Sequence, residues 1–338
     1  MELRVPRQWP IWSKPSRFIS FSLACILLQF FCSLLGGQQG GSSTGQAPPG
    51  SLITQKPETS IRVDSDLVLI PVTVTDKSGK AISGLEKEHF TLLEDNAPQE
   101  ITHFAAEDAP VSVAVVFDAS DSMSPKLSKA REAVEVLLDK INPQSESSLI
   151  RVGTAARVLV PLTGELEAVK EIAAEMRTGG STALLDGVHL AMTEMAKAKY
   201  VRKAIIIISD GEDNASHWTV KELKAAVREQ DILIYAIALT DPGAADYPGS
   251  LQENGLALLR DIAGQSGGYT FTLSKAQQLP AVAEKIGGWL RNQYMLGYVP
   301  SRSATDGSYR KVQLKLARPK GYPRMQAVWR RGYYAPKE

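Results

Sequence analysis

The chain has 338 residues, 43% hydrophobic and 22% charged, which is enough for one large or two modest domains with an ordinary buried core. Its 38 basic and 37 acidic residues give a net charge of +1, so nucleic-acid binding driven by bulk charge is disfavoured. The only cysteines, Cys25 and Cys32, lie in an apolar stretch near the N-terminus. If that stretch is removed, disulfide frameworks, thiolate metal sites and cysteine nucleophiles are excluded together.

Residues 1–37 have the pattern of a secretory signal peptide. Basic residues, among them Arg4 and Arg17, precede an apolar run from Phe18 to Leu35. The run is close to the roughly 20 residues that span a bilayer, so an uncleaved N-terminal membrane anchor is the alternative. Either alternative predicts export, with the remainder periplasmic, extracellular or anchored facing outward. Residues 38–60 are rich in Gly, Ser, Gln and Pro and are expected to form a disordered linker.

Two flanking segments show short β-strand patterns. In residues 61–109, apolar side chains occupy alternate positions from Val68 to Val74, and turn residues follow. Residues 294–338 carry three further strand patterns, at 294–299, 309–316 and 325–333. Each flank is too small for a core of its own. We therefore expect the two flanks to pair in one β-sandwich-like unit.

Between the flanks, residues 110–293 alternate strands with helices. Continuous apolar runs, typical of parallel strands covered on both faces, occur at 111–117, 204–208 and 232–239. Helical patterns, with apolar residues three and four apart, occur at 127–141, 165–176, 183–199, 220–229, 256–262 and 279–290. This order predicts an α/β fold: a doubly wound, mostly parallel sheet flanked by helices, with the smaller β unit beside it.

Oxygen-bearing side chains gather where the predicted strands end. Asp118, Ser120 and Ser122 leave the first buried strand, and Asp210 leaves the second. A glycine-containing loop at 178–182 precedes a helix and offers further hydroxyls. Ligands of doubly wound sheets bind at the carboxyl ends of the strands. Because the set contains no sulfur and no imidazole, it suits Mg²⁺, Mn²⁺ or Ca²⁺ and not zinc or copper.

Simpler interpretations of the same residues exist. Asp118 and Ser120 could cap the helix that follows, and Asp210 could be an ordinary turn residue. His217 and Trp218 follow Asp210 and could line the ligand face, although an exposed loop is the simpler interpretation.

The basic residues of the C-terminal flank are interpreted as the solvated face of a strand and not as a nucleic-acid site. They include Arg310, Lys311 and Lys315.

The five oxygen-bearing positions match a known family. The spacing DxSxS at Asp118, Ser120 and Ser122, Thr182 in GGST, and Asp210 in SDG resemble the metal-ion-dependent adhesion site of von Willebrand factor type A domains. The resemblance implies that the three hydroxyls bind a divalent cation, most often Mg²⁺, with both aspartates acting directly or through water. It also implies an open position for the acidic group of a partner. The order of the flanks, with LIPVTVTDKSGK before and QYMLGYVPS after, resembles the VWFA-related proteins of acidobacterial genomes.

The expected function is therefore metal-bridged binding of a carboxylate on a protein partner, in adhesion or in the cell envelope. The partner is not nucleic acid, and membrane contact is expected only through an uncleaved N-terminal segment. The first alternative is a scaffold in an envelope assembly, in which the metal only rigidifies loops. A metal-dependent hydrolase is a further alternative, but no placed general base or known nucleophile motif supports catalysis, so we do not expect an enzyme.

Overall fold

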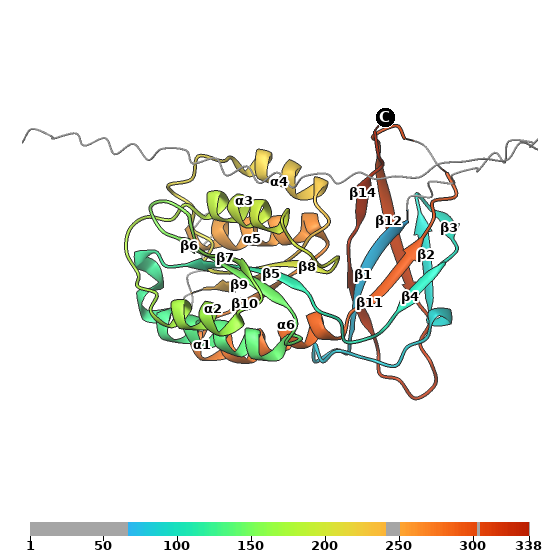
Figure 1. Cartoon of the computed structure of the whole chain (residues 1–338), viewed down its shortest axis with the longest axis horizontal. Coiled ribbons are helices and arrows are strands. Elements are labelled where there is room, and N and C mark those ends of the chain that lie inside the picture. Colours follow the sequence, from blue (N-terminus) through green and yellow to red (C-terminus); the bar gives the residue numbers. More distant parts are fainter. Residues whose placement is uncertain (1–66, 241–250, 303–304, 338) are drawn as a thin grey trace, which may run out of the picture. The chain divides into compact units, whose positions relative to one another are not determined.

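The computed structural model describes residues 67–240, 251–302 and 305–337 (Figure 1). The expected signal peptide or anchor at 1–37 and the expected linker at 38–60 lie outside the described residues, as does the loop 241–250. Within the described ranges, no helix combines the length and the apolar character needed to cross a membrane.

A six-stranded sheet forms the centre of the α/β part, in the order β10-β9-β8-β5-β6-β7. Its strands are β5 (Ser112–Asp118), β6 (Glu146–Val152), β7 (Arg157–Thr163), β8 (Lys203–Ser209), β9 (Leu233–Leu239) and β10 (Tyr269–Leu273). Neighbouring strands run parallel except β7, which is antiparallel to β6. Every residue of β5 and β9 is buried, as expected for central strands covered on both faces.

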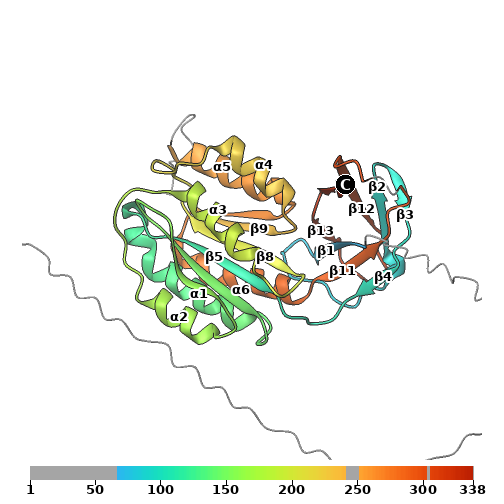
Figure 2. The same ribbon diagram turned by 45° about the horizontal axis from the view of Figure 1, so that its top comes forward.

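Helices cover both faces of this sheet (Figures 1 and 2). One face packs against α1 (Leu127–Lys140), α2 (Leu166–Ala174) and α6 (Leu279–Arg291). The other packs against α3 (Leu184–Met195), α4 (Val220–Glu229) and α5 (Leu251–Ser266). Short 3-10 helices are η1 (Lys87–His89), η2 (Asp121–Lys126) and η4 (Ala276–Gln278). The predicted α/β fold class is confirmed.

The flanks form two small antiparallel sheets around a shared core, in the orders β13-β1-β11-β4 and β14-β12-β2-β3. The N-terminal strands are β1 (Val68–Thr75), β2 (Phe90–Glu94), β3 (Ala97–Gln99) and β4 (His103–Ala105). The C-terminal strands are β11 (Tyr294–Tyr298), β12 (Tyr309–Leu316), β13 (Gln326–Trp329) and β14 (Gly332–Tyr334). The predicted pairing of the two flanks is therefore confirmed.

The sequence predicts a single strand at 325–333 in the C-terminal flank, but the structure has two strands there, β13 and β14. β13 pairs with β1 in one sheet, whereas β14 pairs with β12 in the other. The chain passes from sheet to sheet at Arg330 and Arg331, so the run of alternating residues is divided between two ladders.

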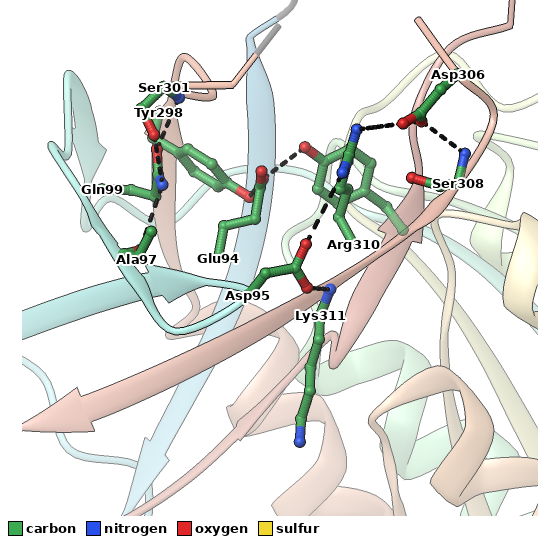
Figure 3. Close-up of polar contacts among 11 residues, drawn as sticks. Glu94, Asp95, Ala97, Gln99, Tyr298, Ser301, Asp306, Ser308, Arg310 and Lys311 are labelled. Carbon is green, nitrogen blue, oxygen red and sulfur yellow. Dashed lines mark hydrogen bonds and ion pairs between the residues drawn. The ribbon is translucent and has the colours of Figure 1, made fainter. Parts of the chain in front are cut away.

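A buried carboxylate joins the two flanks. Glu94, at the end of β2, is 4% exposed and accepts hydrogen bonds of 2.7 Å from the hydroxyls of Tyr298 and Tyr333. Burial and the Glu94 carboxylate raise the pKa of both tyrosines, so both remain protonated donors at neutral pH. One side chain from the N-terminal flank is thus held by two from the C-terminal flank (Figure 3).

The prediction for Arg310 is wrong. Its side chain is only 5% exposed and its guanidinium donates two hydrogen bonds of 3.1 Å to the Asp306 carboxylate (Figure 3). In β12, Arg310 occupies the same alternate positions as the buried Val312, whereas Lys311 and Lys315 are exposed as predicted. Arg310 is therefore a buried ion-pair partner, and the paired carboxylate offsets part of its desolvation.

Candidate metal centre

The first loop of the site begins at Asp118, the last residue of the buried strand β5. One carboxylate oxygen of Asp118 accepts a hydrogen bond of 3.0 Å from the Ser120 N–H, and the other accepts one of 2.5 Å from the Ser209 hydroxyl. The hydroxyls of Ser120 and Ser122 lie 3.1 Å apart. Ser120 precedes η2 without forming a side-chain cap, so the capping interpretation does not describe it.

Backbone hydrogen bonds tie the second loop to the first. Gly179 donates to the Ala119 carbonyl at 2.8 Å, and Asp121 donates to the Gly180 carbonyl at 3.2 Å. Gly180 has a φ of +88°, a conformation that glycine adopts without strain. Thr182, 1% exposed, ends this loop two residues before α3.

The third loop follows β8 and bonds to the second. The backbone N–H of Thr182 donates to the side-chain oxygen of Asn214 at 2.8 Å, and Asn214 donates its own N–H to the Thr182 carbonyl at 2.9 Å. Asp210, 2% exposed, is the first residue after β8. The structure therefore brings Asp118, Ser120, Ser122, Thr182 and Asp210 to one edge of the sheet on three mutually bonded loops.

A glycine is required directly after Asp210. Gly211 has a φ of +86°, and a Cβ there would lie 2.4 Å from the Gly255 carbonyl oxygen in α5. The loop that carries Asp210 therefore packs directly on the backbone of α5, which holds this carboxylate at the sheet edge.

The site contains two buried carboxylates and one buried ammonium. Burial, with a smaller contribution from the charge of Asp210, raises the pKa of Asp118 to about 6 in spite of its hydrogen bonds. The Lys126 ammonium lies 3.6 Å from a carboxylate oxygen of Asp210. Sequence reasoning missed Lys126 and the Ser209 hydroxyl, although Ser209 belongs to the SDG motif.

His217 and Trp218 contact α3. The side chain of His217, 92% exposed, bonds through Nδ1 to the Asp186 carboxylate at 2.9 Å. The ring of Trp218 stacks on His189 with their centroids 3.9 Å apart. Asp186 also accepts the backbone N–H groups of both residues, which fixes the loop against the first turn of α3. The hydrogen bonds of His217 and the stacking of Trp218 thus involve α3 and none of the five site residues.

The residues of the site fit a hard divalent cation. Its side chains supply two carboxylates and three hydroxyls, the oxygen ligands that Mg²⁺ and Ca²⁺ accept. In the described part of the chain, no cluster of three or more His, Cys, Asp or Glu side chains is placed to hold a metal ion. A cation here would therefore depend on the three hydroxyls as much as on the carboxylates.

A comparison with protein-family models decides the family. Residues 112–285 match the model of the von Willebrand factor type A domain. The match spans just over half of the chain and contains all five residues of the site. The chain belongs to the von Willebrand factor type A (VWA) family. The VWA fold accounts for the mostly parallel sheet, and the two antiparallel sheets of the flanks lie outside the matched residues.

Several solved structures are similar to this VWA protein. A von Willebrand factor type A protein from Catenulispora acidiphila is 14% identical, covers 82% of this chain and 76% of its own, and has a TM-score of 0.48. The conserved hypothetical protein BatB from Bacteroides thetaiotaomicron is 22% identical, with 52% and 97% covered and a TM-score of 0.42. The PilB minor pilin from Streptococcus sanguinis is 11% identical, with 54% and 62% covered and a TM-score of 0.45. A search of curated proteins found no match.

The raised pKa of Asp118 predicts how cation binding depends on pH. A proton competes with a cation for this carboxylate, so the apparent affinity is expected to fall about tenfold for each pH unit below about 6. Above about 6 the carboxylate is ionised and the affinity should level off. Calorimetric titration with Mn²⁺ from pH 5 to 8 measures this. An affinity that does not change between pH 5 and 7 would contradict the prediction.

Proposed function

We propose that this VWA protein holds a divalent cation, Mg²⁺ in the first place, at Asp118, Ser120, Ser122, Thr182 and Asp210. We propose further that it uses the cation to bind an acidic group of a protein partner. The observation that carries the proposal is the convergence of these five oxygen-bearing side chains on three mutually bonded loops at the end of the sheet. The membership of the VWA family supports it.

The five residues of the proposed site would have two different roles. The hydroxyls of Ser120, Ser122 and Thr182 would supply neutral ligands, and the carboxylates of Asp118 and Asp210 would balance the charge of the cation. The bound cation supplies a positive centre that attracts a carboxylate. Ser122 is exposed, so the site is open to solvent on its side. The hydrogen bonds of Asp118 to Ser120 and Ser209 keep its carboxylate oriented before a cation arrives.

We propose binding and not catalysis. The four histidines of the chain all lie in the described part. His89 bonds its own turn at Glu86, His103 lies in β4, His189 stacks on Trp218, and His217 bonds Asp186. None of these contacts involves the five residues of the proposed site, which supports binding over catalysis because general-base catalysis needs a base within reach of the cation.

We also propose that the protein is exported and belongs to the VWFA-related group from acidobacterial genomes. The basic and apolar pattern of residues 1–37 supports export, either with a cleaved signal or with a retained anchor. The β unit built from both flanks supports the proposed group, because the group has the same order of segments.

Thermal unfolding tests the cation site. The protein is unfolded first in EDTA and then in excess Mg²⁺, Mn²⁺ or Ca²⁺. Stabilisation by at least one of these ions is expected, because a ligand that binds only the folded state raises its stability. A peptide ending in glutamate should then bind in the presence of the ion and not in EDTA. If no ion changes the unfolding temperature, the proposal fails. If an ion raises the unfolding temperature but the peptide does not bind, the alternative of a scaffold, in which the metal only rigidifies loops, is favoured.

A further inference from the structure

The backbone of Thr182 is held on both sides by the third loop of the site. Its N–H donates to the side-chain oxygen of Asn214 at 2.8 Å, and its carbonyl accepts the N–H groups of Asn214 and Ala215 at 2.9 and 3.0 Å. These hydrogen bonds fix the peptide groups before and after Thr182. Two consecutive residues of one loop therefore determine the backbone position of a proposed ligand in another.

The fixed backbone determines where the Thr182 hydroxyl lies. Threonine is branched at Cβ, which restricts its first side-chain torsion, so the direction of the hydroxyl follows from the backbone. Thr182 is 1% exposed, and within the described part of the chain its hydrogen bonds are formed by its backbone groups alone. The hydroxyl is therefore left for a cation.

The third loop also caps the helix that follows Thr182. The N-cap residue of α3 is Ala183, whose side chain accepts no hydrogen bond. Asp213 supplies the acceptor instead, because one of its carboxylate oxygens accepts the N–H groups of Leu184 and Leu185 at 2.9 and 3.3 Å. Adjacent side chains of the loop thus have separate partners: Asp213 holds the start of α3, and Asn214 holds Thr182.

Asn214 links two of the proposed ligands. It lies four positions after Asp210 in the loop that follows β8, and the beginning of this loop is fixed by the packing of Gly211 on the backbone of α5. The bonds between Asn214 and Thr182 therefore tie the position of the Thr182 hydroxyl to that of the Asp210 carboxylate.

We propose that Asn214 is a positioning residue of the cation site, which presents the Thr182 hydroxyl at a fixed place relative to Asp210. The inference rests on the proposed function and deepens it. A hydroxyl has no net charge that draws a cation toward it, so it contributes most to affinity when it is held in place before the cation arrives. Loss of a residue that orients a metal ligand typically weakens metal binding by about 10- to 100-fold.

The contact itself can be tested in the metal-free protein. Asn214 is exposed, so Asn214→Ala removes the acceptor of the Thr182 N–H without leaving a cavity in the core. Hydrogen exchange of the Thr182 amide, followed by NMR, should become at least about tenfold faster. The Leu184 amide, which is bonded to Asp213, should keep its rate. Asn214→Asp keeps an acceptor oxygen and should preserve the slow exchange of Thr182.

Mn²⁺ binding, measured by calorimetry, tests the role of this contact. Asn214→Ala should bind Mn²⁺ about 10- to 100-fold more weakly than the wild type. The matched control is Ser216→Ala, in the same loop. The Ser216 hydroxyl bonds Asp213 and the N–H of Asp186 and none of the five site residues, so this variant should stay within about twofold of the wild type.

A double-mutant cycle separates positioning from a general structural effect. Thr182→Val keeps the backbone and the branched shape of the side chain and lacks the hydroxyl. If Asn214 acts through that hydroxyl, Asn214→Ala should change the Mn²⁺ affinity of the Thr182→Val protein by less than about twofold. In the Ser122→Ala protein, which lacks a different proposed ligand, Asn214→Ala should keep its full effect.

The outcomes distinguish the inference from the proposed function. If the wild type binds Mn²⁺ and Asn214→Ala weakens binding equally with and without the Thr182 hydroxyl, or weakens it in neither case, the inference is overturned while the proposed function stands. An unchanged exchange rate of the Thr182 amide in Asn214→Ala also overturns it. If the wild type binds no Mn²⁺, the proposed function fails and the inference fails with it.

Discussion

Replacing Asp118 with alanine is expected to abolish the stabilisation that we propose a divalent cation gives to this protein. For the wild type, a cation at a hundredfold over its dissociation constant should stabilise the fold by about 2.7 kcal/mol, which raises the unfolding temperature by roughly 5 to 11 °C for a domain of this size. Asp118 is fully buried at the end of β5, where its carboxylate lies among the other site residues, so its loss removes a charge that no neighbour replaces. Thermal unfolding with EDTA and with Mg²⁺ measures the difference.

The matched control is Asp121→Ala. Asp121 lies in the same loop but is exposed, and it is not among the five site residues. This variant should keep the full cation-dependent shift. Circular dichroism should show that both variants retain the fold. An undiminished shift in the folded Asp118→Ala protein would refute the assignment of Asp118 to the cation site.

The second large effect concerns the N-terminal β unit. A peptide of residues 61–109, expressed alone, is expected to show no cooperative unfolding. Within the described residues, and apart from the single bridge between Thr75 and Ala81, the partners of β1 are β11 and β13, and the partner of β4 is β11. All of these partners lie in the C-terminal flank. Of the ladders formed by the N-terminal strands, only the short pairing of β2 with β3 would remain.

Thermal melting followed by circular dichroism measures this, with the full chain as the reference. Removal of residues 309–338 from the full chain is the complementary experiment, because it takes away β12, β13 and β14 while leaving β1 and β11. It should destabilise the β unit and leave Glu94 without the hydroxyl of Tyr333. A sigmoidal melting transition of the isolated peptide would contradict the shared-sandwich interpretation.

Three of the four inner strands of the central sheet, β5, β8 and β9, could be predicted from the sequence because they contain continuous apolar runs. The edge strand β10 was not predicted, because Tyr269 to Leu273 alternates threonine with larger apolar residues and contains no continuous apolar run. Alternation along β12 would have predicted that Arg310 faces inward with Val312, but its charge favoured the solvated face. The alternation of the strand places the Arg310 side chain inside, and the ion pair with Asp306 offsets part of the cost of burying its charge.

At the candidate site, the five oxygen-bearing side chains could be predicted because motifs at strand ends meet at one sheet edge. The polar side chains that contact the two aspartates could not be predicted in this way. Ser209 bonds Asp118 across 91 positions of the chain, and that contact depends on the register of β8 against β5. Lys126 approaches Asp210 only because η2 turns as a 3-10 helix before α1 begins. Both contacts depend on three-dimensional geometry that the sequence motifs do not contain.

The position of β1 has a mechanical consequence. β1 lies between β11 and β13, antiparallel to both, and its register spans Val68 to Val72 on one side and Val72 to Thr75 on the other. Hydrogen bonds in antiparallel ladders lie perpendicular to the strands. A force that pulls the chain from the Leu67 end, along β1, would therefore load both ladders in shear, with many bonds resisting at once. Strand β1 is therefore placed to resist a pull on the chain at Leu67.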